Sequence, residues 1–414
     1  MEKGKVPEIR FKGFTDDWKQ YQLSHIAKRV IRKNTGLQST LLLTISAQYG
    51  LIGQITYFNC RVAGINIRNY YLLKKGEFAY NKSSSEGFPY GAIKRLDLYE
   101  NGVLSGLYIV FALKDVNKIN SDFIVSYYDT EKWQKDISEV AAEGARNHGL
   151  LNISVDNFMK TKLMIPHINK EQQLIGNYFK SFDNLITLHQ RRYEKLKFFK
   201  KAMIKKMFPK NGEKVPEIRF KGFTDNWEQH KLKDIANKVN QKNRDLSVLE
   251  TFTNSAEYGV VSQRDFFEYD VSNIENISGY FIVGKDNFVY NPRISAIAPV
   301  GPINRNKLGR KGIVSPSYTV FQVHNIDYTF LEYFFKGNAW HSYMYFNGDN
   351  GARTDRFSIK NEVFFDMPIL YPQIEEQRMI GRYLERLDNL IILHQSKYEK
   401  LKLFKAAMLE KMFV

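Results

Sequence analysis

The chain has 414 residues, 43% hydrophobic and 14% aromatic, which is enough apolar surface for sizeable cores and argues against disorder. The single cysteine, Cys60, excludes a disulfide framework and a zinc knuckle, and no apolar run approaches the ~20 residues that span a bilayer. A net charge of +17 favours a polyanionic partner, with nucleic acid as the first candidate and an acidic membrane surface as the second.

The first recognisable segment, residues 6–18, returns almost unchanged as residues 215–227, and Asp17 against Asn226 is the one difference. A repeat spanning half of the chain is far longer than the ~20–50 residues of a solenoid unit, so it indicates a duplicated domain. The charged start of the chain, interrupted by Pro7 and Gly13, does not resemble a signal peptide, and we therefore expect a cytoplasmic protein.

The interior of each half diverges around matched anchors such as Trp133 and Trp340. Strands are predicted at 103–113 and 313–323, and turn-broken strands at 70–80 and 280–290, because β-branched and aromatic residues dominate there. Residues 123–135 and 328–345 are predicted to be helical. Each half is therefore expected to contain an α/β (α+β) globule.

Near-identity returns at residues 176–208 and 381–413, which contain no proline. Apolar residues there recur at steps of three and four, a heptad-like pattern that predicts two long helices of roughly 55–60 Å at ~1.5 Å per residue. We expect the two helices to pack as an antiparallel coiled coil, with His189 and His394 as polar register-setting positions rather than metal ligands. The predicted seam consists of Ile175, Phe179, Phe182, Ile186, His189, Leu196, Ile380, Leu384, Leu387, Ile391, His394 and Leu401.

These patterns divide the chain into four parts related by a pseudo-twofold internal repeat. Residues 1–168 and 211–374 are expected to form the two globular modules, and residues 169–210 and 375–414 the two long helices.

Candidate DNA-reading side chains gather in polar segments between the matched anchors. The Gly-Ala-Arg triplets at 144–146 and 351–353 are the first choice, because small residues let a loop approach a surface that an arginine then contacts. An exposed turn with a solvated arginine is the alternative for these triplets. The residues assigned here are Arg146, Asn147, Arg353 and Arg356.

Further candidates follow the matched Tyr-Asn pairs and lie in basic or polar loops, where ordinary turn roles are equally compatible with the sequence. Side chains that suit groove contact are Asn81, Lys82, Ser83, Asn291 and Arg293. Basic residues expected on phosphates are Lys94, Arg95, Arg305, Arg310 and Lys311. Matched polar positions that suit base reading are Gln48, Gln54 and Gln263, with Glu257 opposite Gln48.

Catalytic motifs are missing from the sequence. It has no phosphate-binding GxxxxGK[ST] loop, no glycine-rich dinucleotide fingerprint, no matched pair of carboxylates with a lysine, and no zinc-ligand spacing. Tyr290-Asn291-Pro292-Arg293 is a weak likeness to an amino-methyltransferase motif, but Arg293 replaces the second proline and the other copy reads Tyr80-Asn81-Lys82-Ser83. We therefore expect a binding protein with no catalytic residues and no metal or cofactor of its own.

The near-identical leading segments, the divergent middles and the paired helices that begin near Glu171-Gln172 and Glu376-Gln377 resemble the specificity subunits of type I restriction–modification enzymes. The resemblance covers essentially the whole chain. It implies that each middle is a target recognition domain for one half of a split, asymmetric site on double-stranded DNA, and that the helices fix the spacing. It also implies two methyltransferase subunits and two motor-nuclease subunits as partners, which would carry S-adenosylmethionine, ATP and magnesium.

The sequence is also compatible with three other kinds of protein. A stand-alone DNA-binding protein of the same duplicated build would need no methyltransferase partner. An enzyme with a hidden nuclease or methyltransferase site would turn over DNA alone, and a coiled-coil scaffold for proteins would show no preference for any DNA sequence.

Overall fold

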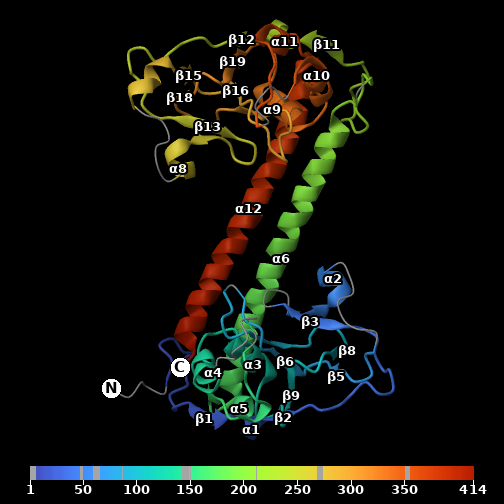
Figure 1. The fold of residues 1–414 in the computed structure, drawn as a ribbon, viewed down its shortest axis with the longest axis vertical. Helices are drawn as coiled ribbons and strands as arrows, with labels where there is room; N and C mark the ends of the chain where they lie inside the picture. The colour runs from blue at the N-terminus through green and yellow to red at the C-terminus, as the bar shows by residue number, and fades with distance from the viewer. Residues whose placement is uncertain are drawn as a thin grey trace. The chain divides into compact units, whose positions relative to one another are not determined.

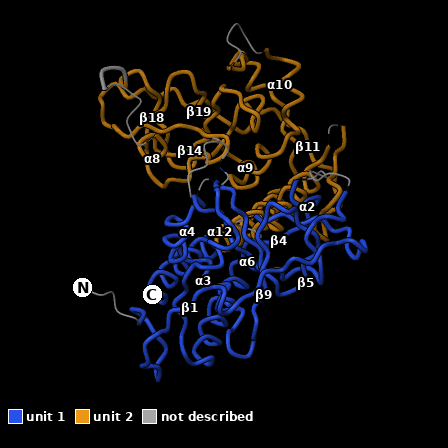
Figure 2. Tube along the Cα trace, turned by 60° about the horizontal axis from the view of Figure 1, so that its bottom comes forward, with its two compact units in different colours: residues 1–190, 396–414 blue, residues 191–395 orange. Residues whose placement is uncertain are grey.

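The computed structural model describes residues 6–46, 50–58, 66–85, 87–141, 149, 151–210, 212–267, 274–349 and 355–414. It divides into two compact units, and neither unit is one half of the chain. Unit 1 consists of Met1–Gln190 with Ser396–Val414, and unit 2 of Arg191–Gln395 (Figure 2).

Unit 1 is built on short antiparallel strands. They are β1 (Lys19–Gln22), β2 (Ala27–Arg29), β3 (Leu43–Ser46), β4 (Gly50–Gly53), β5 (Tyr71–Lys74), β6 (Phe78–Asn81), β7 (Ala92–Arg95), β8 (Asn101–Leu104), β9 (Ile109–Leu113) and β10 (Lys162–Ile165). The largest sheet has the order β2-β9-β6-β7, and β1 pairs with β10, β3 with β4, and β5 with β8. Short helices complete the unit: α1 (Leu23–Ile26), α2 (Gln54–Phe58), α3 (Ser121–Tyr128), α4 (Gln134–Val140) and α5 (Val155–Met159).

Unit 2 repeats this topology strand for strand. Its strands are β11 (Glu228–Lys231), β12 (Ala236–Lys238), β13 (Phe252–Ser255), β14 (Gly259–Ser262), β15 (Phe281–Val283), β16 (Phe288–Tyr290), β17 (Ile303–Arg305), β18 (Gly312–Val314), β19 (Thr319–Val323) and β20 (Pro368–Tyr371). The four-stranded order is β12-β19-β16-β17, and the pairs are β11–β20, β13–β14 and β15–β18. The helices are α7 (Leu232–Ile235), α8 (Gln263–Phe267), the 3₁₀ helix η1 (Ile274–Gly279), α9 (Tyr328–Lys336), α10 (His341–Asn347) and α11 (Asn361–Phe365).

The register of the main sheets shows that the duplication extends to individual side chains. Phe78 lies opposite Phe111 across β6 and β9, and their rings stack with centroids 5.3 Å apart. Phe288 lies opposite Phe321 across β16 and β19, at 5.4 Å. The predicted turn-broken strands are confirmed as β5–β6 and β15–β16, whereas the single strands predicted at 103–113 and 313–323 are each two strands joined by a turn.

Two long helices, α6 (Asn169–Met207) and α12 (Ile374–Met412), confirm the helices predicted from the heptad-like pattern. Helix α6 ends two residues before Pro209, whose ring and missing N–H do not fit a helix interior. In each unit a stretch of α6 runs beside a stretch of α12 in the opposite direction (Figure 1). In unit 1, for example, Phe182 packs on Phe404 and Phe179 on Phe413, so the numbers rise on one helix as they fall on the other.

The end of each helix fills the core of the other half's globular module. The core of unit 1 contains Leu409, Met412 and Phe413, which belong to the second half of the sequence. The core of unit 2 contains Met207 and Phe208 from the first half. Each unit is therefore completed by residues that are distant in the sequence. The contribution is large, because one buried aromatic side chain removes roughly 150–250 Å² from water.

The expected coiled-coil seam needs a correction at its start. Ile175 and Phe179 belong to the core of unit 1, and Ile380, Leu384 and Leu387 to the core of unit 2, where strands and short helices cover them. These positions are buried by a globular module as well as by the facing helix, because the first turns of α6 and α12 insert into their own modules. The remaining seam positions, Phe182, Ile186, His189, Leu196, Ile391, His394 and Leu401, are half-buried.

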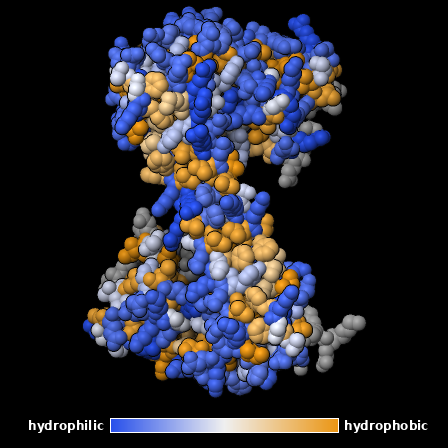
Figure 3. All heavy atoms as spheres, turned by 180° about the vertical axis from the view of Figure 1, so that it is seen from behind, coloured by the Kyte–Doolittle hydropathy of each residue, from blue (hydrophilic) through white to orange (hydrophobic). Residues whose placement is uncertain are grey.

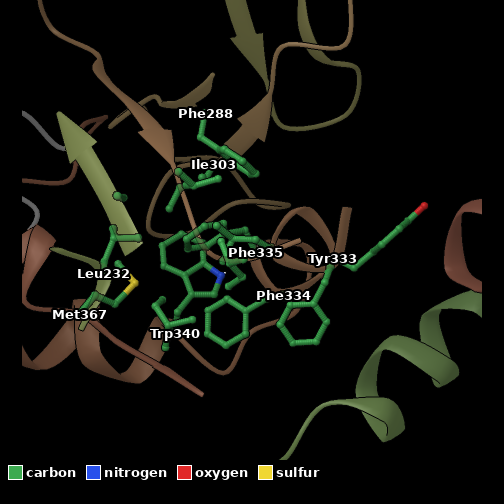
Figure 4. Packing of buried hydrophobic residues seen from close by; sticks show 14 of the residues in the cluster. Leu232, Phe288, Ile303, Tyr333, Phe334, Phe335, Trp340 and Met367 are labelled. Atoms are coloured by element: carbon green, nitrogen blue, oxygen red, sulfur yellow. Dashed lines mark hydrogen bonds between the residues drawn. The ribbon is translucent and has the colours of Figure 1, made fainter. Parts of the chain in front are cut away.

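Aromatic residues make up a large part of the core of unit 2 (Figure 4). Trp340 is buried against Phe335, and its indole N–H donates to the Phe335 carbonyl at 3.2 Å, so its one polar atom is satisfied. Tyr333 carries its hydroxyl away from the other labelled rings, and the hydroxyl donates to Asp388 of α12 at 2.5 Å. The core therefore both packs against and hydrogen-bonds to the long helix.

Candidate nucleic-acid interface

The loop that follows each Tyr-Asn strand ends at an equivalent glycine in both units. Gly91 and Gly301 have φ of +76° and +82°, and a Cβ atom on either would lie 2.0 or 2.2 Å from the carbonyl oxygen of Asn81 or Asn291. Only glycine fits this close approach of backbone to backbone. The sequence between Tyr-Asn and glycine is therefore free to vary on a fixed frame.

In both units this loop is hydrogen-bonded to the segment that follows the Gly-Ala-Arg triplet. In unit 1 the Ser84 amide donates to the Gly149 carbonyl at 2.6 Å, and the Leu151 amide to the Lys82 carbonyl at 3.0 Å. In unit 2 the Ile294 amide donates to the Asp355 carbonyl at 3.0 Å, and the Phe357 amide to the Pro292 carbonyl at 2.8 Å. The structure thus joins the loop after each Tyr-Asn pair to the residues that follow the triplet, and in unit 2 this places Arg293 beside Arg356.

Unit 2 presents two predicted arginines at this junction. Arg293 and Arg356 face each other across an antiparallel bridge, and the Arg293 side chain is 66% exposed. Its guanidinium lies 3.7 Å from the Asp355 carboxylate, which is itself half-exposed. An exposed pair of this kind contributes little to stability, so Arg293 can exchange Asp355 for another acceptor at small cost.

Several predicted residues lie outside the described part of the chain. They are Arg146, Asn147, Gln48 and Arg353, so the triplet arginines themselves stay predictions.

The asparagines that end the Tyr-Asn pairs shape the loop. The side-chain oxygens of Asn81 and Asn291 accept from the amides of Ser83 and Arg293, both at 3.0 Å. Asn291 is also buried and donates to the Asn254 carbonyl at 2.9 Å. Its expected base contact is corrected to a structural role, because its amide is engaged inside the module. Ser83 is exposed and Lys82 half-buried at the loop surface.

The expected phosphate contacts of Arg95 and Arg305 also need correction. Both side chains are only 10–12% exposed. Arg95 donates to Asp122 at 2.6 Å, and Arg305 to Glu332 at 3.1 Å, which joins the main sheet to the following helix. Burial opposes the charged form of Arg95, but its hydrogen bonds to Asp97 and Asp122 raise its pKa, so it stays charged and paired.

The other basic candidates differ in whether a carboxylate already pairs with them. Lys94 donates to Asp129 at 2.7 Å, and Arg310 grips Glu250 with two bonds of 2.7 Å. Lys311 is exposed. Arg293 and Lys311 are therefore the basic candidates that the described structure leaves most available to a phosphate.

Gln54 and Gln263 occupy equivalent positions at the starts of α2 and α8. Their side-chain amides donate to the carbonyls of Leu43 and Phe252, at 3.3 and 3.4 Å. Because both units make the same internal bond, these glutamines support the β3–β4 and β13–β14 hairpins, and their base-reading role stays a prediction.

A pair of residues that sequence reasoning left without a role joins the leading segment to the long helix. Arg10 binds Glu171 through two bonds of 2.6 and 2.9 Å, and Arg219 binds Glu376 at 2.7 and 2.8 Å. Both glutamates are buried, and these contacts raise the pKa of both arginines. The sequence signal for this contact was that the same arginine and the same glutamate occur at equivalent positions in both copies.

Among the described residues there is no group of three or more potential metal ligands, and no helix long and apolar enough to cross a membrane.

Two divergent modules with one topology, joined through near-identical helices, define a class of protein. The chain matches the family "Type I restriction modification DNA specificity domain" twice, over residues 15–197 and 224–403, and it belongs to that family.

Individual relatives agree with this assignment. The chain is 23% identical over 321 residues to the type I restriction enzyme MjaVIII specificity subunit of Methanocaldococcus jannaschii, covering 74% of this chain and 72% of that one. Its fold is similar to the crystal structure of a type I restriction–modification system S subunit from M. genitalium, with a TM-score of 0.58, 12% identity and 99% of each chain covered. The chain is thus a two-domain type I specificity protein.

Proposed function

We propose that this chain is the non-catalytic DNA-recognition subunit of a type I restriction–modification complex, in which each module reads one half of a split site. The observation that carries the proposal is one topology present twice, with near-identical long helices and divergent loops at equivalent places. Two unlike readers on one chain suit an asymmetric, interrupted site. Their binding free energies combine when both halves are engaged, so neither module needs to bind tightly alone.

The loop junctions are the proposed base-reading surface. Arg293 and Arg356 in unit 2, and Lys82 and Ser83 in unit 1, lie on or beside the bonded loops. The arginines of the Gly-Ala-Arg triplets, Arg146 and Arg353, directly precede these segments in sequence and are proposed to act there. Arginine and lysine reach guanine edges or phosphates, and a divergent loop changes which bases are accepted.

The long helices are proposed to set the distance between half-sites. A rigid spacer makes the separation a geometric constant, since one base pair adds ~3.4 Å and about 35° of rotation. The spacer bases would be passed over through their backbone and would carry no sequence information.

Exposed apolar side chains on the long helices support docking of a protein partner. Phe198 is 78% exposed and the equivalent Leu403 is 73% exposed. Hydrophobic side chains are visible along the helices on the face drawn in Figure 3. Exposed apolar residues that recur at one helix position suit an interface, and we propose methyltransferase subunits as its occupants, with motor-nuclease subunits completing the restriction enzyme. S-adenosylmethionine, ATP and magnesium would belong to those subunits.

A chimera tests the modular reading of DNA. The segment 19–165 is replaced by the corresponding segment of another specificity subunit, and methylated sites are sequenced from cells that carry the complex. One half-site should change while the other half-site and the spacer length stay the same. A simultaneous change in both halves would contradict the proposal.

An insertion tests the spacing role. Seven residues added at equivalent points of α6 and α12 lengthen each helix by about 10 Å, close to three base pairs. The methylated motif should keep both half-sites and gain a longer spacer. A methylated motif with an unchanged spacer would show that the helices do not set the distance between the half-sites.

A further inference from the structure

Unit 2 contains a basic cavity of about 560 Å³ between the second half of α6 and the turn that joins α9 to α10. Figure 1 labels α9 and α10 beside the upper parts of α12 and α6. We call it the lysine pocket. Its charged lining residues are Lys197, Lys200, Lys201, Lys205, Lys336 and Asp388.

Carboxylates neutralise only part of this positive charge. Lys200 is ion-paired with Asp388, and Lys336 donates to Glu332 at 2.8 Å. Lys201 and Lys205 are exposed and form no ion pair with any residue that the structure describes, and Lys197 lies 5.0 Å from the centre of the Tyr193 ring. Burial and the nearby charge of Lys336 lower the pKa of Lys200 despite its bond to Asp388, as expected where positive charge is in excess.

The equivalent place in unit 1 has the opposite charge. The helices correspond residue by residue, and Ala406 and Glu410 occupy the positions of Lys201 and Lys205. In the turn, Asp129 and Glu131 occupy the positions of Lys336 and Asn338, with Trp133 and Trp340 as the anchor. The two helices are otherwise nearly identical, so a reversal of charge where each helix meets the other half's module is not expected of an ordinary solvated helix face.

The lysine pocket also adjoins the proposed base-reading loop of unit 2. Ile297 lines the pocket and belongs to the loop between Asn291 and Gly301 that carries Arg293. Lys197, Lys201 and Lys205 follow one another at steps of four, so they form a row with about 6 Å between neighbours along the helix. A row of charges suits a chain of phosphates better than a single small anion.

We propose that the lysine pocket binds backbone phosphates of the DNA next to the half-site that unit 2 reads, and that unit 1 has no counterpart. This inference rests on the proposed function. The two modules would then differ in affinity for the DNA backbone as well as in the bases that they read, since unit 2 would bind the backbone more tightly than unit 1. Phosphate contacts add affinity without adding sequence information.

The experiment gives unit 2 the residues of unit 1. Lys201→Ala and Lys205→Glu are combined, and both substitutes occur at the same helix positions in the other half, so the helix tolerates them. Affinity for a duplex carrying the methylated motif is measured from about 50 to 200 mM salt, with the full chain in its complex. The slope of log affinity against log salt should fall by about 2, since each phosphate contact contributes roughly 0.9.

The matched control is Lys195→Ala on the same helix, an exposed lysine outside the pocket. It should leave the slope close to that of the unchanged chain, and neither variant should alter the methylated motif. If the double variant keeps the original slope, or loses a protein partner instead of DNA affinity, the phosphate site is overturned while the recognition function stands. If the unchanged chain shows no preference for its motif, the recognition function itself fails.

Discussion

The two places where a long helix completes the other half's module share their apolar packing and differ in their charges. Phe413 packs against Trp18, Phe123 and Phe179 in unit 1, and Phe208 against Trp227 and Phe330 in unit 2. About two turns earlier on α12, Lys405 donates to Asp129 and Asp183 in unit 1 at 2.8 and 2.6 Å. The corresponding Lys200 of unit 2 has Asp388 as its carboxylate and Lys336 nearby.

The comparison separates contacts that both units retain, which are the aromatic ones, from contacts that differ between the units, which are the charged ones. Shape-complementary aromatic packing closes each module and tolerates little change in volume. The charged shell around it tolerates replacement, provided that each buried charge keeps a partner. Partner and DNA contacts are therefore free to diverge around a fixed core.

The largest expected effect tests the shared packing. Phe413→Ala and Phe208→Ala each remove a buried aromatic ring, which costs about 3–5 kcal/mol of unfolding free energy. Hydrogen exchange of the full chain should rise in unit 1 for Phe413→Ala and in unit 2 for Phe208→Ala. Faster exchange in the opposite unit would mean that the helix ends do not close the modules described here.

The next effect tests the charge difference. Lys405→Ala leaves the largely buried Asp129 beside Asp183 with Lys94 as its remaining cation. We expect a loss of about 2–3 kcal/mol, below the ~3–5 kcal/mol of a fully buried pair, because Asp183 is half-exposed. Lys200→Ala should cost below about 1 kcal/mol, because Asp388 keeps its hydrogen bond from Tyr333. Equal losses in denaturant unfolding of the two variants would contradict the comparison.

A smaller effect separates reading from support within unit 2. Arg293→Ala should weaken binding to the specific duplex by about 1–3 kcal/mol without changing stability, because its guanidinium is exposed and loosely paired. Arg305→Ala should do the reverse, since its guanidinium is buried between Glu332 and Asp286. Paired titrations and melting curves check this, and a binding loss confined to Arg305→Ala would reverse the two roles.

The smallest effect is a pH dependence with opposite signs at the two lysines. The pKa of Lys405 is raised, since its two carboxylates outweigh burial, so its pair stabilises unit 1 at neutral pH and is lost only above the ordinary lysine pKa of ~10.4. The pKa of Lys200 is lowered, so its charged form opposes folding, and this cost is relieved as the pH rises through its folded-state pKa towards ~10.4.

The measurement compares unfolding free energies at pH 7 and 10. The Lys200→Met variant should lack the part of the change between these pH values that Lys200 supplies. Lys405→Met, the matched variant in unit 1, should keep that change, because the Lys405 pair is lost only above the ordinary lysine pKa of ~10.4. An unchanged pH dependence in Lys200→Met would show that its folded-state pKa is not lowered.

Repetition and periodicity made most of the fold predictable. The long helices followed from a heptad-like pattern present twice, and the β5–β6 and β15–β16 strands from matched aromatic and β-branched runs. Periodicity identifies which helix face is buried but not what covers it. Ile175 and Ile380 were therefore assigned to a helix–helix seam although a module covers them.

The candidate site was harder to predict because ion pairs join distant positions. Arg95 and Arg305 match in the two copies, but their carboxylates, Asp122 and Glu332, lie at different positions of the next helix. No local pattern distinguishes such an arginine from the exposed Arg293. The link between the Tyr-Asn loop and the segment after Gly-Ala-Arg likewise depends on backbone bonds that leave no signature in side chains.

The placement of Phe413 in the core of unit 1 has a consequence for synthesis. During synthesis, residues 1–190 emerge from the ribosome long before residues 396–414 are made. Until then the first module has an unfilled hydrophobic site lined by Trp18, Phe123 and Phe179. Unit 2 has Phe208 from the start and can close as soon as its own residues emerge. Premature termination near the end of the message would therefore damage the module made first and spare the one made last.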